Sequence, residues 1–151
     1  MNEPILRPPP VVIDGQNVAG YSLKSDGWNW QLVIDIATFH HAEGSQVHVV
    51  VPVWIDKSYI KMLDSVADII RFTPVSKLDK EGDDKLALGR AALIDGFIVT
   101  NYKKIGKHTR GDLLTREWCA SHRIGFRFGD DGYQPLYPKL WTRAIQPPIQ
   151  D

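Results

Sequence analysis

The chain has almost no cysteine, no long apolar run and no net charge, and the first two absences each exclude a class of protein. Cys119 is the only cysteine among 151 residues, which excludes a disulfide framework and a cysteine-based zinc site. No apolar run approaches the length of a membrane span, and the first residues lack the basic and apolar regions of a signal peptide. We therefore expect no membrane contact and a cytoplasmic location, with the nucleus or an organelle as alternatives.

Motifs for several common chemistries are also missing. The chain contains neither GxGxxG nor GxSxG, so neither a dinucleotide site nor a nucleophile elbow is indicated. Residues 105–109 have part of a P-loop but lack its leading glycine. A nucleotide hydrolase or phosphatase is therefore the weakest of the enzymatic alternatives.

The zero net charge hides an asymmetry along the chain. Residues 1–100 carry nine basic and 13 acidic side chains, whereas residues 101–151 carry nine basic and five acidic ones. Four basic residues gather in one short stretch: Lys103, Lys104, Lys107 and Arg110. This stretch is either a solvated surface loop or a rim that binds phosphates beside an acidic centre.

Short runs of β-branched and apolar residues alternate with segments of helical periodicity. The predicted strands are residues 11–13, 47–51, 69–72, 97–100 and 124–128. The predicted helices lie near residues 32–44, 56–68, 83–93 and 112–121, with Leu86, Ala87, Ala91 and Leu93 as the inward positions of the third. This alternation predicts an α/β domain with a parallel sheet, whose ligand site lies at the carboxyl ends of the strands. The tail from residue 130 is expected to wrap the surface.

Two acidic positions are candidates for that site. Asp14 ends a strand that is apolar throughout, and a buried carboxylate is costly unless it meets a cation or several hydrogen bonds. Asp83 and Asp84 open the third predicted helix. Each has a structural alternative, because Asp14 can cap a turn and the Asp pair can cap a helix. Grouped carboxylates otherwise suit Mg²⁺ or Mn²⁺, which prefer oxygen ligands.

Residues 12–19, Val-Ile-Asp-Gly-Gln-Asn-Val-Ala, resemble the first-strand motif of the NYN/PIN-like ribonucleases, most closely the Regnase (Zc3h12a-type) endoribonuclease domain. The resemblance continues in the family's order through 49–54, 72–74, 83–84, 95–101, 126–128 and 130–135. It implies a three-layer PIN-like (Rossmann-like) α/β domain over residues 10–138, with a parallel sheet of about five strands in the order 3-2-1-4-5. Residues 1–9 would be a Pro-rich lead and residues 139–151 a tail.

The resemblance also implies a function. It indicates a divalent-metal-dependent endoribonuclease that cleaves single-stranded RNA, in RNA decay or silencing. Asp14 would be the main ligand of Mg²⁺ or Mn²⁺, Asp83 and Asp84 would bind the ion directly or through water, and Asn17 would orient a water or a phosphate. The alternative is a catalytically weak or inactive domain that binds RNA, a protein partner or a second copy of itself as a scaffold.

One departure from the family pattern bears on catalysis. Relatives commonly have an aspartate directly after the asparagine that ends the fourth strand, whereas this chain has Tyr102. Asp112 either supplies the missing acid or caps the next helix. Trp28 and Trp30 lie between the first strand and the first long helix, where they either stack on unpaired bases or pack a loop against the domain.

Overall fold

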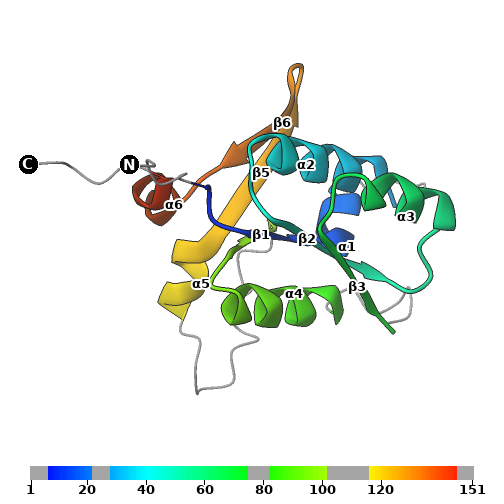
Figure 1. Cartoon of the computed structure of the whole chain (residues 1–151), viewed down its shortest axis with the longest axis horizontal. Helices are drawn as coiled ribbons and strands as arrows, with labels where there is room; N and C mark the ends of the chain where they lie inside the picture. Colours follow the sequence, from blue (N-terminus) through cyan, green and yellow to red (C-terminus); the bar gives the residue numbers. More distant parts are fainter. Residues whose placement is uncertain (1–6, 22–27, 75–81, 102–115, 146–151) are drawn as a thin grey trace, which may run out of the picture.

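The computed structural model describes residues 7–21, 28–74, 82–101 and 116–145. Its centre is a six-stranded sheet in the order β3-β2-β1-β4-β5-β6 (Figure 1). The strands are β1 (Val11–Asp14), β2 (Val47–Pro52), β3 (Ile69–Thr73), β4 (Phe97–Val99), β5 (Arg123–Gly129) and β6 (Gly132–Leu136). All neighbours pair in parallel except β5 and β6, which are antiparallel. The predicted α/β class and the order 3-2-1-4-5 are confirmed, with a sixth strand added.

Helices cover both faces of the sheet and make the three layers. The helices are α1 (Gly15–Ala19), α2 (Gln31–Ala42), α3 (Lys57–Asp64), α4 (Gly82–Leu93), α5 (Arg116–His122) and α6 (Lys139–Ile145). Helix α4 lies below the sheet in Figure 1, and α2 and α3 lie above it. None of the helices in the described ranges is long and apolar enough to cross a membrane.

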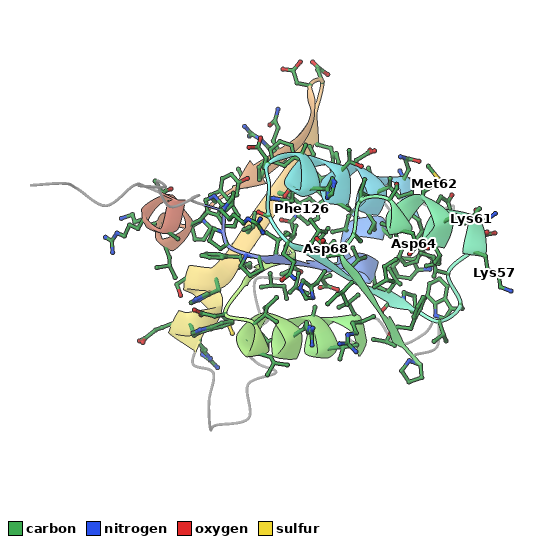
Figure 2. The ribbon with its side chains drawn as sticks, viewed as in Figure 1. Lys57, Lys61, Met62, Asp64, Asp68 and Phe126 are labelled. Carbon is green, nitrogen blue, oxygen red and sulfur yellow. The ribbon has the colours of Figure 1, made fainter. Side chains whose placement is uncertain are left out.

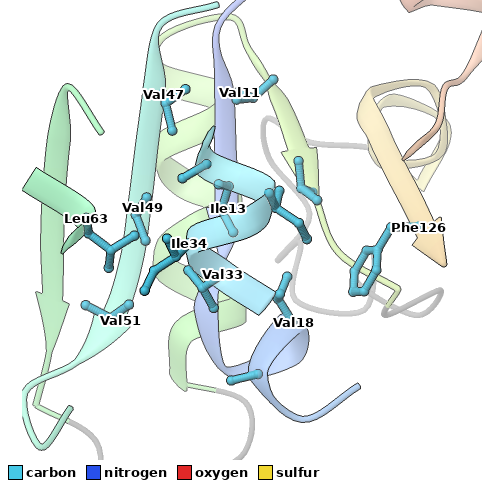
Figure 3. Packing of buried hydrophobic residues seen from close by; sticks show 14 of the residues in the cluster. Val11, Ile13, Val18, Val33, Ile34, Val47, Val49, Val51, Leu63 and Phe126 are labelled. Atoms are coloured by element: carbon cyan, nitrogen blue, oxygen red, sulfur yellow. The ribbon is translucent and has the colours of Figure 1, made fainter. Parts of the chain in front are cut away.

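The central strand β1 contributes side chains to two hydrophobic cores, because successive side chains point to opposite faces of the sheet. Val11 and Ile13 belong to the cluster under α2 and α3, where Figure 3 shows them beside residues of β2. Val12 belongs to the smaller cluster under α4 and α5. All three are fully buried, as expected for a parallel strand with helices on both faces. The same alternation assigns the next residue, Asp14, to the α4 face.

Two predictions about the packing are wrong. Leu86 and Leu93 were expected to face inward, but they are 39% and 75% exposed. The buried positions of α4 are Ala87, Leu88 and Ala91, which form one helical stripe. Leu86 and Leu93 are apolar residues outside this stripe, so counting apolar positions was not enough to find the buried face.

The tail does not simply wrap the surface, as the sequence led us to expect. Asp130 and Asp131 form a two-residue connection, and Gly132 closes it with a φ of 90°. This backbone conformation favours glycine. Strand β6 then pairs along β5, and α6 places Trp141 in the core with only 3% of its surface exposed. Residues 132–145 therefore contribute a strand and a helix to the domain.

A glycine is required where β1 turns directly into α1. A Cβ on Gly15 would overlap the carbonyl oxygen of Val50 on the neighbouring strand β2 and lie 2.9 Å from the Val51 side chain. The first of these contacts is with backbone, which cannot move without disturbing the central pair of strands. Gly15 therefore lets α1 start immediately after Asp14.

We expect Gly15→Ala to lower the free energy of unfolding by about 1–3 kcal/mol, because the added methyl group forces β1 and β2 apart. Gly89→Ala is the matched control, since Gly89 is exposed in α4 and a Cβ there meets nothing within 4 Å. That change should stabilise the protein by about 0.5–1 kcal/mol. Urea titrations of both variants measure the difference, and equal stability of the two would contradict the overlap at Gly15.

A buried histidine joins α2 to the hairpin. His40 is fully buried, and its Nε2 lies 2.8 Å from the hydroxyl oxygen of Tyr133 on β6. Burial lowers the pKa of His40 from 6.5 to about 4 and raises the pKa of Tyr133. Both groups are therefore neutral at physiological pH, and the hydrogen bond between them is made in a largely apolar surrounding.

This histidine should make stability depend on pH. Between pH 6.5 and 4 the unfolded chain binds a proton at His40 that the folded protein does not bind, so the free energy of unfolding falls as the pH decreases. The loss should reach about 3 kcal/mol by pH 4. In His40→Gln this part of the loss should disappear, whereas the exposed neighbour variant His41→Gln should keep it. Identical pH profiles for the wild type and His40→Gln in urea titrations would refute the assignment.

Candidate active site

Asp14 is the buried centre of the candidate site. It ends β1 at the carboxyl edge of the sheet and has 0% of its surface exposed. Its Oδ2 accepts a hydrogen bond from the hydroxyl of Thr100, 3.0 Å away, directly after β4. The ends of the first and fourth strands thus meet side by side, as the predicted strand order requires.

Asn17 and Asn101 form a second link across the same edge. The side-chain oxygen of Asn17, on α1, accepts the backbone N–H of Asn101 at 2.8 Å. This engages the oxygen of the Asn17 amide in holding the fold and leaves its NH₂ group to serve a ligand. An NH₂ group donates hydrogen bonds, so it suits a phosphate oxygen better than a metal ion.

The side chain of Asn101 continues the sheet where the backbone ladder of β4 stops. Its Nδ2 donates to the carbonyl oxygen of Phe126, and its Oδ1 accepts the N–H of Phe126, both at 2.8 Å. One amide thereby satisfies both backbone groups of a residue on β5. The sequence indicated Asn101 only as a strand end, and this clasp was not predicted.

A partly buried arginine lies on the other side of Thr100. The guanidinium of Arg123, on β5, donates to the Thr100 carbonyl oxygen at 3.2 Å, and burial lowers its pKa. The absence of a side chain at Gly125 leaves room for this contact, because a Cβ there would lie 2.9 Å from the Arg123 Nη1 atom. Sequence reasoning missed Arg123 as a site residue, although its i, i+2 spacing to Gly125 indicates that the two share a face.

The remaining acidic candidates lie partly or wholly outside the described part of the chain. Asp83 and Asp84 are in the first turn of α4. Helix α4 connects the carboxyl end of β3 to the amino end of β4, so its first turn lies at the carboxyl edge. Among the described side chains, no three His, Cys, Asp or Glu residues gather as a metal site; the side chains of Asp83 and Asp84 are not among them.

The basic stretch, and the position where this chain differs from the family pattern, also lie outside the described residues. These are the substituted position Tyr102 and five predicted site residues: Lys103, Lys104, Lys107, Arg110 and Asp112. Their roles stay predictions.

Three tryptophans form a cluster, and this cluster bears on whether Trp28 and Trp30 pack a loop or stack on RNA bases. The rings of Trp28, Trp30 and Trp54 have centroids 5.6–6.1 Å apart. Trp30 is only 5% exposed and belongs to the main core, so the structure favours the packing interpretation for it. Trp28 is half-buried on the outside of this cluster, where both packing and base stacking stay open.

One comparison with known proteins gives a match that spans most of the chain. A family model described as "Zc3h12a-like Ribonuclease NYN domain" matches residues 8–139. No curated protein matches the chain.

The Thr100 hydroxyl should stabilise the protein through the Asp14 carboxylate. Thr100→Val keeps the shape of the side chain but removes the donor, so we expect the free energy of unfolding to fall by about 1–3 kcal/mol. Thr100→Ser keeps the hydroxyl and should lose less. Urea titrations with a chelator present compare the variants without interference from metal, and a Val variant as stable as the Ser variant would argue against this bond.

Proposed function

The chain belongs to the Zc3h12a-like ribonuclease NYN domain family, and from this we propose that it is a divalent-metal-dependent endoribonuclease that cleaves single-stranded RNA. The observation that carries the proposal is the fully buried Asp14 carboxylate at the sheet edge where α4 begins with two further aspartates. Such a concentration of acid at the carboxyl ends of parallel strands suits a metal ion, which can in turn bind a phosphate, better than it suits stability alone.

The residues present fit Mg²⁺ or Mn²⁺ in the chemistry of their donors. Asp14 and Asp84 would hold the ion through carboxylate oxygens, with Asp83 binding directly or through water. Position 84 lies three residues before the buried Ala87, so helical periodicity puts it close to the stripe that faces β1. When bound, the ion would lower the pKa of a water molecule and neutralise charge on the phosphate.

The chain's own residues would position the substrate. Thr100 fixes the orientation of the Asp14 carboxylate, and the NH₂ group of Asn17 would donate to a phosphate oxygen. The basic stretch would draw RNA to the acidic centre: Lys103, Lys104, Lys107 and Arg110. A single strand is favoured because its phosphates are flexible enough to enter a crevice and its unpaired bases can stack.

An aspartate that relatives commonly have is absent from this chain, and its absence raises an alternative to catalysis. With Tyr102 in place of an aspartate, either Asp112 completes the acidic centre or the domain binds RNA, a protein partner or a second copy of itself without cleaving. Our proposal is that Asp112 serves as the further acid and that the enzyme acts in RNA decay or silencing in the cytoplasm. The two functions differ in one measurable respect, which is whether the purified protein cuts RNA.

The decisive experiment replaces Asp14 by asparagine, which keeps the side chain's size but removes the charge. Cleavage of an unstructured RNA should be abolished, because the variant lacks the negative charge that holds the metal ion. The fold should persist, because replacing a buried carboxylate by a neutral amide removes the cost of burying a charge. The melting temperature of the wild type should rise on adding Mn²⁺, and this rise should vanish in Asp14→Asn. A chelator should stop cleavage by the wild type, and excess Mg²⁺ or Mn²⁺ should restore it.

Asp64→Asn is the charge-matched control, because Asp64 is exposed on α3 (Figure 2) and outside the site. It should cut RNA as the wild type does. A wild type that never cuts RNA with any divalent ion, or an Asp14→Asn variant that cuts as well as Asp64→Asn, would reject the ribonuclease and favour the scaffold.

A further inference from the structure

Tyr21 is an exposed aromatic ring held in a fixed position near the candidate site. Its side chain is 41% exposed. Its ring centroid lies 5.3 Å from that of Phe126 and 5.5 Å from that of Phe128, both on β5. Phe126 is buried and Phe128 is half-buried, so the tyrosine rests on an aromatic base that belongs to the core.

The backbone places Tyr21 one helical turn after Asn17. The N–H of Gly20 donates to the Gln16 carbonyl oxygen at 2.9 Å, and the N–H of Tyr21 donates to the Val18 carbonyl oxygen at 3.1 Å, so helical hydrogen bonding continues past the end of α1. The second of these bonds spans three residues, so the chain tightens just past the end of α1. Tyr21 therefore lies one turn further along the chain than the amide that would hold a phosphate.

A second route through the structure connects Tyr21 to the same amide. The ring of Tyr21 contacts Phe126, whose backbone N–H and C=O are held by the Asn101 side chain. The N–H of Asn101 in turn donates to Asn17. Tyr21 is thus fixed to the Asn17–Asn101 pair both along α1 and across β5, and its ring needs little further ordering to bind a ligand.

We propose that Tyr21 is a stacking platform for an unpaired RNA base beside the phosphodiester that Asn17 would contact. This inference rests on the proposed ribonuclease function and adds the element that binds a base rather than a phosphate. An aromatic face with an amide donor one turn away matches the two parts of a nucleotide, a flat base and an anionic phosphate. The structural alternative is that Tyr21 only covers Phe126.

Tyr137 provides a matched control on the same molecule. It is 36% exposed and stacks on Trp141 with ring centroids 4.7 Å apart, so it resembles Tyr21 in exposure and in aromatic support. It lies beside His40 on α2 rather than beside Asn17. Both rings lie on a buried aromatic residue, but only Tyr21 is on the segment that carries Asn17.

The test measures binding of short unstructured RNAs by fluorescence anisotropy, with a chelator present so that no cleavage occurs. Tyr21→Ala should raise the Kd about tenfold, whereas Tyr21→Phe and Tyr137→Ala should bind as the wild type does. A set of RNAs carrying one abasic nucleotide at successive positions locates the stacked base. At one position the abasic RNA should bind the wild type and Tyr21→Ala equally, because the partner of the ring is gone.

Several results would overturn the platform. Tyr21→Leu keeps an apolar cover on Phe126 without a ring, so a Leu variant that binds RNA as tightly as the wild type would assign the covering role. An unchanged Kd in Tyr21→Ala would also contradict base stacking, and so would a loss of affinity in Tyr21→Ala that persists with every abasic RNA.

The results also separate this inference from the proposed function. If the wild type cuts RNA and Tyr21→Ala binds RNA normally, the platform alone is rejected. Wild type that binds but never cuts, with the abasic pattern present, would reject only the ribonuclease.

Discussion

Burial of the Asp14 carboxylate is the constraint on which the candidate site depends. Strand β1 is the third of six strands and is covered by helices on both faces, so the residue at its end has no water around it. A charged group in such a place requires hydrogen-bond donors or a cation. The hydroxyl of Thr100 provides one donor from the neighbouring strand. Gly15 allows the chain to turn away immediately, which keeps the carboxylate at the edge of the sheet rather than inside it.

Side chains take over from the backbone at this edge because β4 is only three residues long. Beyond it, the Asn101 amide makes the two hydrogen bonds with Phe126 that a longer strand would have made through its own peptide groups. Asn17 then accepts the N–H of Asn101 and ties α1 to the same point. The edge is consequently rigid although regular sheet structure has ended there. Rigid support of this kind is what a site needs to hold a phosphate in one orientation.

Much of the fold was predictable because parallel strands covered on both faces are apolar throughout and are separated by helices. Val11–Ile13 is apolar throughout and Val47–Val51 is apolar except for His48, and both are strands. Strand β6 was missed because its sequence, Gly-Tyr-Gln-Pro-Leu, is rich in residues typical of turns, and its pairing with β5 decides its conformation. Asp14 was predictable as the end of a buried strand. The clasp of Asn101 and the reach of Arg123 were not, because they depend on where β4 ends relative to β5 and on the space above Gly125.

The two halves of the proposed site lie on opposite faces of the sheet edge. The alternation of β1 assigns Asp14 to the face covered by α4, whereas Phe126 packs in the cluster beneath α2, and Tyr21 rests on it. Helix α1 carries Asn17 between them and Tyr21 just past its end. A strand of RNA that used both halves would therefore cross the edge of the sheet at α1. A stiff duplex could not bend over such an edge without a large deformation energy, whereas a single strand could. The proposed preference for single-stranded RNA is therefore supported by the geometry of the edge as well as by the chemistry of its residues.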